Sequence, residues 1–178
     1  MSIKGADIRN IAVIGHSGEG KTSVCEAILF NGKTSDRLGK AAEGTTIMDY
    51  DEQEIARKMS ISLSSAYAMW EGVKLNLLDV PGFYDFEGEE NQALRAAGGA
   101  LIVTGATGSI SVGAEKAIDK CLKNKIPMVI FINGMDKENA DYDGTIAALT
   151  EKYPGKIAPI QIPMMEGNKM IGYVNALK

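Results

Sequence analysis

An apolar run, a glycine-rich loop and a helix-forming segment follow one another in IRNIAVI-GHSGEGKT-SVCEAILF, residues 8–30. The run at 8–14 has the length and composition of a buried strand. Residues 21–30 contain no glycine or proline and end before Asn31-Gly32, as a helix commonly does. A strand, a loop and a helix in this order predict the first unit of an α/β fold.

The loop at 15–22 matches the pattern G-x-x-x-x-G-K-[ST]. Its glycines allow successive backbone N–H groups to turn inward around phosphate oxygens, next to the positive end of the helix. Lys21 is expected to reach the β- and γ-phosphates, and the Thr22 hydroxyl to bind Mg²⁺. His16, the single histidine, is expected to pack against neighbouring loops. The phosphate contacts predicted here are Gly15, His16, Ser17, Gly18, Glu19, Gly20, Lys21, Thr22 and Ser23.

Beyond this unit, strands and helices are expected to alternate. Further strands are predicted at 59–67, 73–80, 100–104, 127–133 and 157–162, and helices at 87–97, 114–123 and 142–153. In the first of these strands, the face of Met59, Ile61 and Leu63 is expected to be the apolar one, and a turn at Trp70–Gly72 makes an antiparallel hairpin. The expected architecture is the three-layer α/β fold of P-loop NTPases. Its sheet is mostly parallel, with one antiparallel hairpin strand and helices on both faces.

The segment 31–58 is polar and charged and contains three glycines. It is expected to be a long loop without core-forming residues, with at most a helical turn at 51–57. A loop of this length inside a compact domain is usually functional. Without a nucleotide to hold it, the part from 38 to 58 is expected to be poorly ordered.

Composition excludes several classes of protein. The 178 residues are 45% hydrophobic and 24% charged, as in an ordinary soluble domain rather than a disordered chain or a coiled coil. A net charge of −4 argues against binding to bare DNA, and no apolar run approaches the roughly 20 residues of a membrane span. Cys25 and Cys121 match no metal-binding spacing and are expected to be reduced and buried. We therefore expect a cytoplasmic, monomeric chain with neither DNA nor a membrane as partner.

Two further patterns follow predicted strands. In Asp79-Val80-Pro81-Gly82, the carboxylate can hold Mg²⁺ through water and the glycine N–H can reach a γ-phosphate. In Asn133-Gly134-Met135-Asp136, the last carboxylate can accept two hydrogen bonds from guanine N1–H and its 2-amino group, a pair that adenine lacks. Each pattern is weak alone, but their order after the phosphate loop indicates a guanine nucleotide. The nucleotide contacts predicted from them are Asp79, Gly82, Asn133, Met135 and Asp136.

With these motifs the chain resembles the translational GTPases, and elongation factor G in particular, over essentially its whole length. Residues 44–61 resemble the first switch region of that family, 79–86 the second switch and 133–142 the guanine-reading segment. The resemblance implies GTP or GDP with Mg²⁺ as cofactors, GTP hydrolysis as the activity, and the ribosome as partner of the full-length protein. It also implies roles for particular residues: Mg²⁺ ligands are Thr22, Ser60 and Asp79, and the catalytic contacts are Lys21 and Gly82.

Four positions depart from the family pattern. Gly18 stands where an Asp is usual, so a cation contact by that carboxylate is lost. Ser60 replaces a Thr but keeps the hydroxyl that Mg²⁺ needs. Gly134 replaces a lysine whose alkyl stem would cover one face of the base. Phe83 replaces the histidine that positions the attacking water, and because it has no polar atom, slow hydrolysis is expected.

The departures leave alternatives open. One function is a slow GTPase, in which Tyr84 or Asp85 could take over the positioning of water. The other is a nucleotide-dependent binding switch with little or no hydrolysis, which the departures favour over a fast enzyme. A P-loop kinase or ATPase is a third class, but it would not need the pair Asn133 and Asp136.

The chain is expected to end inside the GTP-binding domain. The Ser-Ala loop that is the family's last guanine motif does not occur, and residues 157–163 resemble the strand before the insert in this domain. The expected division is an incomplete GTP-binding (G) domain at 1–163 and the truncated beginning of the G-domain insert at 164–178. Nucleotide binding by so incomplete a domain is expected to be weak.

Overall fold

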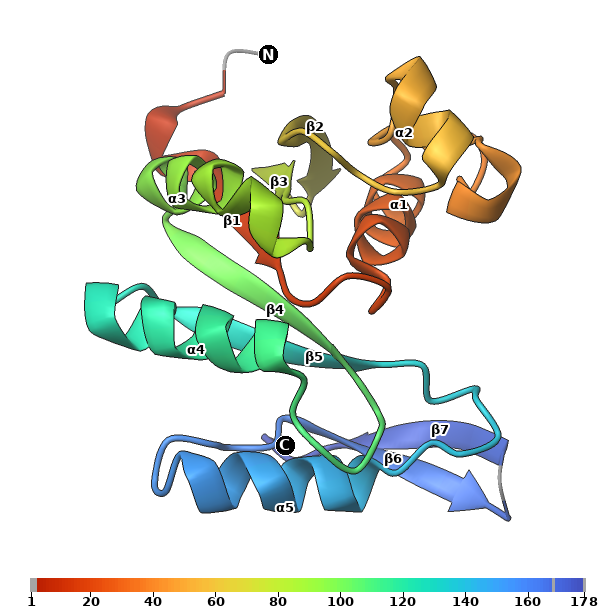
Figure 1. Cartoon of the computed structure of the whole chain (residues 1–178), viewed down its shortest axis with the longest axis vertical. Coiled ribbons are helices and arrows are strands. Elements are labelled where there is room, and N and C mark those ends of the chain that lie inside the picture. The colour runs from red at the N-terminus through yellow and green to blue at the C-terminus, as the bar shows by residue number, and fades with distance from the viewer. Residues whose placement is uncertain (1–2, 168, 178) are drawn as a thin grey trace.

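Five strands form the main sheet of the computed structural model, which describes residues 3–167 and 169–177 (Figure 1). Their order across the sheet is β2-β3-β1-β4-β5. The strands are β1 (Ile8–Ile14), β2 (Ser64–Trp70), β3 (Val73–Asp79), β4 (Gly99–Gly105) and β5 (Met128–Asn133). Only β2 is antiparallel to its neighbour, so the predicted mostly parallel sheet with one hairpin strand is confirmed.

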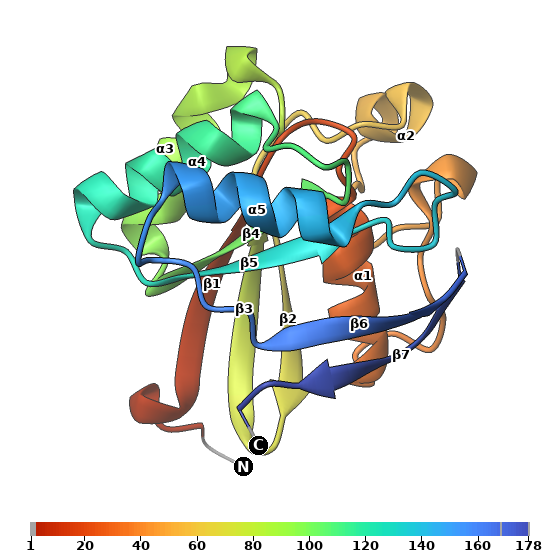
Figure 2. The same cartoon turned by 90° about the horizontal axis from the view of Figure 1, so that it is seen from below.

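Helices cover both faces of this sheet, as Figure 2 shows from below. The helices are α1 (Lys21–Asn31), α2 (Glu52–Arg57), α3 (Glu87–Ala96), α4 (Val112–Asn124) and α5 (Tyr142–Lys152). Val13 of β1 packs with residues of α1, whereas Ala12 and Ile14 pack with residues of α3 and α4. Because successive side chains of a strand point to opposite faces, the continuous apolar run of β1 supplies both halves of the core. The predicted three-layer α/β fold is therefore confirmed.

The strand predicted at 59–67 begins later, at Ser64. The face of the strand that was expected to be buried is the exposed one. The backbone N–H groups of Ile61 and Ser62 donate to the Glu54 carboxylate, at 2.8 and 3.0 Å, and so do not join the sheet. Within β2, Ala68 is buried and Tyr67 is 49% exposed. A Cβ on Gly32, which follows α1, would lie 2.8 Å from the Ala68 Cβ. Because the helix end approaches so closely, β2 turns its small side chains inward.

The segment 31–58 is packed onto the domain more firmly than its polarity suggests. Met48 is 1% exposed and belongs to the core cluster beneath α1. The helical turn predicted at 51–57 is α2, and its N-cap Asp51 accepts a hydrogen bond from the Gln53 N–H at 2.7 Å. The expectation that this segment offers no core residue was wrong, because one methionine in a polar run carries no periodic signal.

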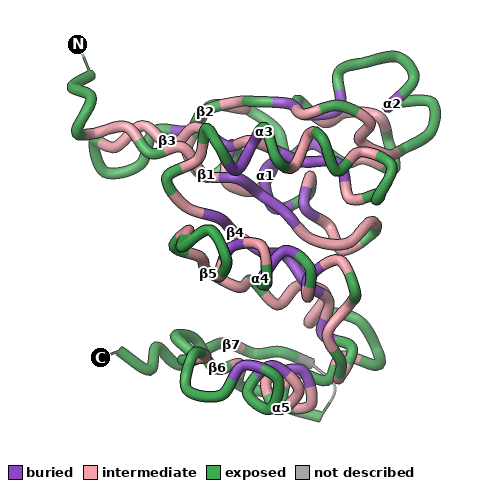
Figure 3. Tube along the Cα trace, turned by 60° about the vertical axis from the view of Figure 1, so that its left-hand side comes forward, coloured by how far each residue is buried: buried purple, intermediate pink, exposed green. Residues whose placement is uncertain are grey.

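The last two strands form a separate sheet. β6 (Gln161–Glu166) pairs with β7 (Lys169–Asn175) in an antiparallel hairpin and not with β5. The predicted strand at 157–162 is thus displaced towards the C-terminus. The predicted division between residues 163 and 164 falls inside β6, and it stays a prediction. Figure 3 shows that buried residues gather in the main sheet and the helices against it, while the hairpin is largely exposed.

Candidate functional site

The phosphate loop lies at the carboxyl end of β1, between the ends of β3 and β5. Gly20 has a φ of 90°, and a Cβ there would collide with the Asn133 amide nitrogen. Gly82, which follows β3, approaches so closely that a Cβ on it would lie 2.7 Å from the Ser17 backbone nitrogen and would also collide with the Lys21 ammonium. Both positions require glycine. The other two predicted nucleotide motifs are therefore both in direct contact with the phosphate loop.

Lys21 is held inside the loop that it follows. Its side chain is buried, and the ammonium donates to the His16 carbonyl oxygen at 2.9 Å. Burial lowers the pKa of Lys21, while the nearby carboxylates of Asp79 and Glu19 act in the opposite direction. An ammonium that has already lost most of its hydration and lies between acidic groups is well prepared to meet an anionic phosphate.

The three residues predicted as Mg²⁺ ligands meet at the start of α1. The Thr22 hydroxyl donates to Asp79 Oδ2 at 2.7 Å and lies 3.2 Å from the Ser60 hydroxyl oxygen. Ser60 in turn donates to Asp49 Oδ1 at 2.6 Å. Asp49 is 4% exposed, and the sequence analysis missed it. It belongs to no sequence motif, and nothing in the spacing of the acidic residues in this polar segment distinguishes it from its neighbours.

Burial gives this cluster unusual acid–base properties. It raises the pKa of Asp79 to about 7, against the opposing effects of the Thr22 hydrogen bond and the Lys21 charge. Burial also raises the pKa of Asp49. The second oxygen of the Asp79 carboxylate is buried and has no hydrogen-bond partner among the described residues. Polar atoms left in this way commonly mark the place of an ion or water.

The donor set fits Mg²⁺ bound together with phosphate. Carboxylate and hydroxyl oxygens are the ligands that Mg²⁺ prefers, and it usually completes its shell with water and substrate phosphates. Among residues 3–167 and 169–177, no group of three or more His, Cys, Asp or Glu side chains is placed to hold a metal ion. Protein groups alone would therefore hold the ion weakly, and Thr22, Ser60 and Asp79 are the residues that would hold it.

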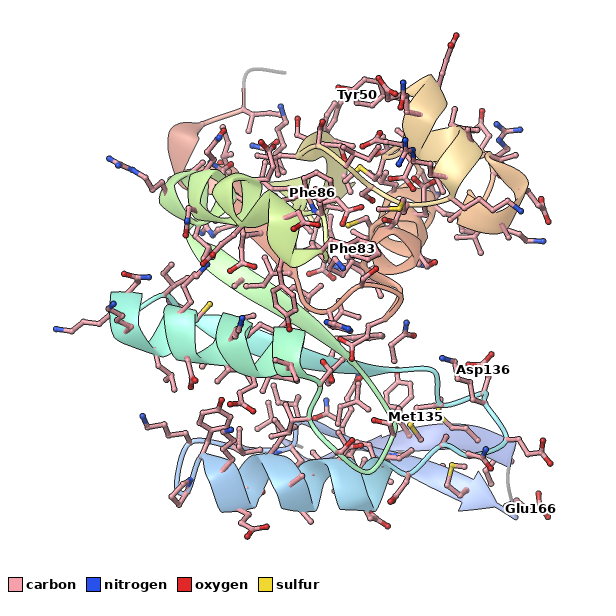
Figure 4. All side chains as sticks on the ribbon, viewed as in Figure 1. Tyr50, Phe83, Phe86, Met135, Asp136 and Glu166 are labelled. Atoms are coloured by element: carbon pink, nitrogen blue, oxygen red, sulfur yellow. The ribbon has the colours of Figure 1, made fainter. Side chains whose placement is uncertain are left out.

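The end of β5 is tied to the phosphate loop. The Asn133 amide donates to the Glu19 carbonyl oxygen at 2.8 Å, and the Glu19 carboxylate accepts the His16 N–H at 3.1 Å. Met135 and Asp136 follow on the loop after β5, as Figure 4 shows, and Asp136 is exposed. The geometry thus fixes the start of the predicted guanine-reading segment and leaves its carboxylate accessible.

The segment after Gly82 rests on the phosphate loop and α4. Phe83, labelled in Figure 4, begins this segment, and its side chain is 42% exposed. The Tyr84 ring centroid lies 6.1 Å from that of His16, and the Lys116 ammonium lies 4.0 Å from the Tyr84 ring centroid. His16 also packs against α4, where a Cβ on Gly113 would lie 2.6 Å from the His16 Cα. The structure therefore surrounds His16 with neighbouring elements, as expected for a packing role.

A cavity of about 1020 Å³ adjoins the guanine-reading segment on the side away from α1. It lies between β5, α5 and the β6–β7 hairpin, and its lining includes Asn133 and Asp136 but no residue of the phosphate loop. In the part of the chain that the structure describes, no helix has the length and apolar character needed to cross a membrane.

Comparison with known proteins agrees with this geometry. A family model described as the elongation factor Tu GTP binding domain matches residues 6–173. Elongation factor G of Dehalococcoides mccartyi is 36% identical over 157 residues, which are 88% of this chain and 23% of that protein. An elongation factor G-like protein of Mycobacterium tuberculosis is 34% identical over 168 residues, which are 94% of this chain and 23% of that protein.

Two further likenesses extend the comparison. The mitochondrial ribosome-releasing factor 2 of Anopheles gambiae is 32% identical over 170 residues, 96% of this chain and 23% of that protein. A crystal structure of a Thermus thermophilus protein superposes with a TM-score of 0.89 at 34% identity, covering 96% of this chain and 26% of that one. The chain thus spans about a quarter of the length of the relatives that it matches. The predicted resemblance to translational GTPases is confirmed, and this chain belongs to the elongation factor Tu GTP-binding domain family.

Proposed function

We propose that the protein binds GTP and GDP together with Mg²⁺, and that the full-length protein hydrolyses GTP slowly while acting at the ribosome. One observation carries the proposal. Thr22, Ser60 and Asp79 come from three separate segments, their oxygens meet, and the buried Lys21 ammonium is near enough for its charge to act on Asp79. This combination suits a Mg²⁺–phosphate group better than any other common ligand.

The residues of the phosphate loop and of the Mg²⁺ site then have distinct parts in binding. The backbone N–H groups from Ser17 to Ser23 surround the phosphates, and Lys21 and the Gly82 N–H reach the γ-phosphate. Mg²⁺, when bound, neutralises charge on the phosphate oxygens. Thr22, Ser60 and Asp79 hold the ion, and the raised pKa of Asp79 returns towards its ordinary value because the cation favours the ionised carboxylate.

Guanine selectivity is assigned to Asp136 and tested there. Asp136→Asn should shift the preference of the full-length protein from GDP towards XDP, because an amide donates to the 2-oxo group that xanthine has in place of the 2-amino group. Competition between GDP, XDP and ADP measures the preference. Asp143→Asn, on the exposed side of α5, is the matched control and should change nothing. An unchanged preference in Asp136→Asn would show that this carboxylate does not face the base.

Slow hydrolysis is assigned to Phe83, which has no atom able to hydrogen-bond the attacking water. Phe83→His in the full-length protein should accelerate ribosome-stimulated GTP hydrolysis by roughly 10²–10⁴-fold, the contribution of a positioned acid–base group. Tyr84→Phe and Asp85→Asn test the two neighbouring groups that could replace it. Fast turnover of the native protein that survives both of these changes would contradict the assignment.

A nucleotide-dependent binding switch with little or no hydrolysis is the second candidate. It is favoured by the same absence of a polar group at Phe83. Single-turnover hydrolysis with and without ribosomes separates the two functions. In a pure switch the bound GTP stays intact, while ribosome binding still differs between GTP and GDP.

The ribosome is proposed as partner because the similar proteins carry the names elongation factor G and ribosome-releasing factor 2. We also propose that the protein is monomeric and acts in the cytoplasm. An insert is proposed to interrupt its G domain near residues 163 and 164. Co-sedimentation of the full-length protein with ribosomes should be stronger with a non-hydrolysable GTP analogue than with GDP. Absence of co-sedimentation in both states would remove the ribosome from the proposal, and equal co-sedimentation would remove its dependence on the nucleotide.

A further inference from the structure

The turn that reads the base contains a glycine whose missing side chain is replaced by another residue. Gly134 has a φ of 76°, and the Lys137 N–H donates to its carbonyl oxygen at 3.1 Å. This bond folds the chain back, so that the Lys137 side chain crosses Gly134. A Cβ on Gly134 would lie 3.2 Å from Lys137 Cε and 3.3 Å from Cδ. The Lys137 methylenes therefore lie next to the place where a side chain on residue 134 would begin.

No other contact accounts for this course of the side chain. Within the described residues, the Lys137 ammonium makes no ion pair, whereas Lys40, Lys120 and Lys152 each pair with a glutamate. Its stem lies against Gly134, its ammonium would lie 3.6 Å from a Cβ there, and the residue is exposed, an arrangement in which a lysine can cover an apolar surface. A flat ligand can stack on the Lys137 stem.

The position of the turn defines the ligand surface that the lysine can reach. Asn133, immediately before the turn, is hydrogen-bonded to Glu19 of the phosphate loop. Asp136 is the residue before Lys137. A purine whose phosphates enter the loop and whose edge meets Asp136 must lie against this turn, and one of its faces is then adjacent to the Lys137 methylenes.

We propose that Lys137 is a nucleotide-binding residue whose alkyl stem covers one face of the guanine base. The proposal rests on the proposed function, since it requires that a guanine nucleotide enters this site. Methylene groups exclude water from the ring face, and the ammonium adds a cation–π attraction where it lies over the ring. Gly134 and Lys137 act as a pair, because a Cβ at 134 would press on the stem, 3.2 Å from its Cε.

The test measures nucleotide affinity of the full-length protein by displacement of a fluorescent GDP derivative. Lys137→Ala should weaken GDP binding roughly tenfold, in line with loss of the stem contact together with an exposed cation–π contact. Lys137→Met, which keeps the length and apolar character of the stem, should recover most of the loss. Lys123→Ala removes an exposed lysine of α4 and should leave the affinity unchanged.

Pyrophosphate with Mg²⁺ is the second probe, because it fills the phosphate loop without a base. Lys137→Ala should leave pyrophosphate affinity unchanged, and an equal loss for pyrophosphate and GDP would overturn the assignment to the base. Gly134→Ala should weaken GDP binding in both backgrounds, because a φ of 76° strains any side chain there. The loss should be larger in the native background, where the new Cβ also presses on the stem. Equal effects in both backgrounds would also contradict the pairing.

The outcomes separate this inference from the proposed function. A native protein that binds GDP no better than ADP refutes the proposed function and this inference with it. A native protein that prefers GDP, while Lys137→Ala binds GDP as tightly as native, refutes only the role of Lys137.

Discussion

Two segments flank the phosphate loop, and they are held by different chemistry. The segment 45–63 is fixed by carboxylates that accept its backbone N–H groups. Glu26 of α1 is fully buried and accepts the N–H groups of Ile47 and Met48 at 2.6 and 3.0 Å. Glu54, 3% exposed, does the same for two residues before β2. Such bonds are shielded from water because both carboxyl groups are buried.

The segment 84–90 is instead held by lysines of α4 at the surface. Lys120 lies 3.1 Å from the Glu87 carboxylate and 2.8 Å from that of Glu90, and Lys116 lies over the Tyr84 ring. Glu87 is 68% exposed, so its pair with Lys120 contributes little and is screened by salt, whereas Lys120 and Glu90 are only 19% and 21% exposed. The part around Tyr84 can therefore be released at small cost, whereas Glu89 stays joined to the first segment because it accepts the Leu63 N–H at 2.8 Å. This contrast runs against the sequence-based expectation that 38–58 would be the poorly ordered part.

The largest expected effect concerns Asp79, at the end of the polar chain that joins the first segment to the phosphate loop. Burial raises its pKa from an ordinary 3.8 to about 7, so between these values the folded chain keeps a proton that the unfolded chain releases. Protonation favours the folded state here. The contribution of this group to stability is therefore greatest below about pH 4, falls as the pH rises to 7, and is constant above that.

Asp79→Asn measures this contribution, because the amide oxygen still accepts the Thr22 hydroxyl but cannot titrate. Without nucleotide and Mg²⁺, the variant should be more stable than the native protein at pH 8, by about 4 kcal/mol at most, and the difference should vanish near pH 4. Urea unfolding across this range gives the result. A difference that stays constant with pH would show that Asp79 titrates at its ordinary value.

Glu26→Ala should have the next largest effect. It leaves the N–H groups of Ile47 and Met48 buried without partners and should lower the free energy of unfolding by about 3 kcal/mol. Amide hydrogen exchange should accelerate around these two residues. Glu43→Ala, which removes an exposed carboxylate of the same segment, is the control. Equal stability of the two variants would show that the buried Glu26 carboxylate stabilises the protein no more than the exposed Glu43 carboxylate.

Glu54→Ala should destabilise the protein by about 2 kcal/mol, since its carboxylate is replaced in part by water at the edge of the segment. The matched control is Glu52→Ala, at an exposed position of the same short helix. Urea unfolding compares the two. If both cost the same, the hydrogen bonds to Ile61 and Ser62 do not hold the start of β2.

Lys116→Ala should have the smallest effect, about 0.5 to 1 kcal/mol, because it removes a cation from an exposed aromatic ring. Hydrogen exchange should nevertheless accelerate around Tyr84 and not in 45–63. Lys123→Ala on the same helix controls for loss of charge. Faster exchange in 45–63 would mean that the two segments move together and that the contrast between them is false.

Those parts of the fold that follow from a local pattern of residues were predicted from the sequence. The run of β1, the loop pattern at 15–22 and the face of α4 with Ala114, Ala117, Ile118 and Cys121 buried all agree with the structure. The strand before the hairpin was predicted too early. Its N–H groups are taken by a carboxylate on α2, and no alternation of side chains reports the bonding of the backbone.

The sequence by itself therefore determined the order of strands and helices and the residue types at each strand end. These depend on period, length and local hydrogen bonding, which act between near neighbours. Only the tertiary structure decided that Asp49 joins Thr22, Ser60 and Asp79, and that the Lys137 stem crosses Gly134. The first contact joins distant segments and the second depends on the direction of a turn. Both contacts depend on the three-dimensional path of the backbone, which a pattern of residues along the sequence does not specify.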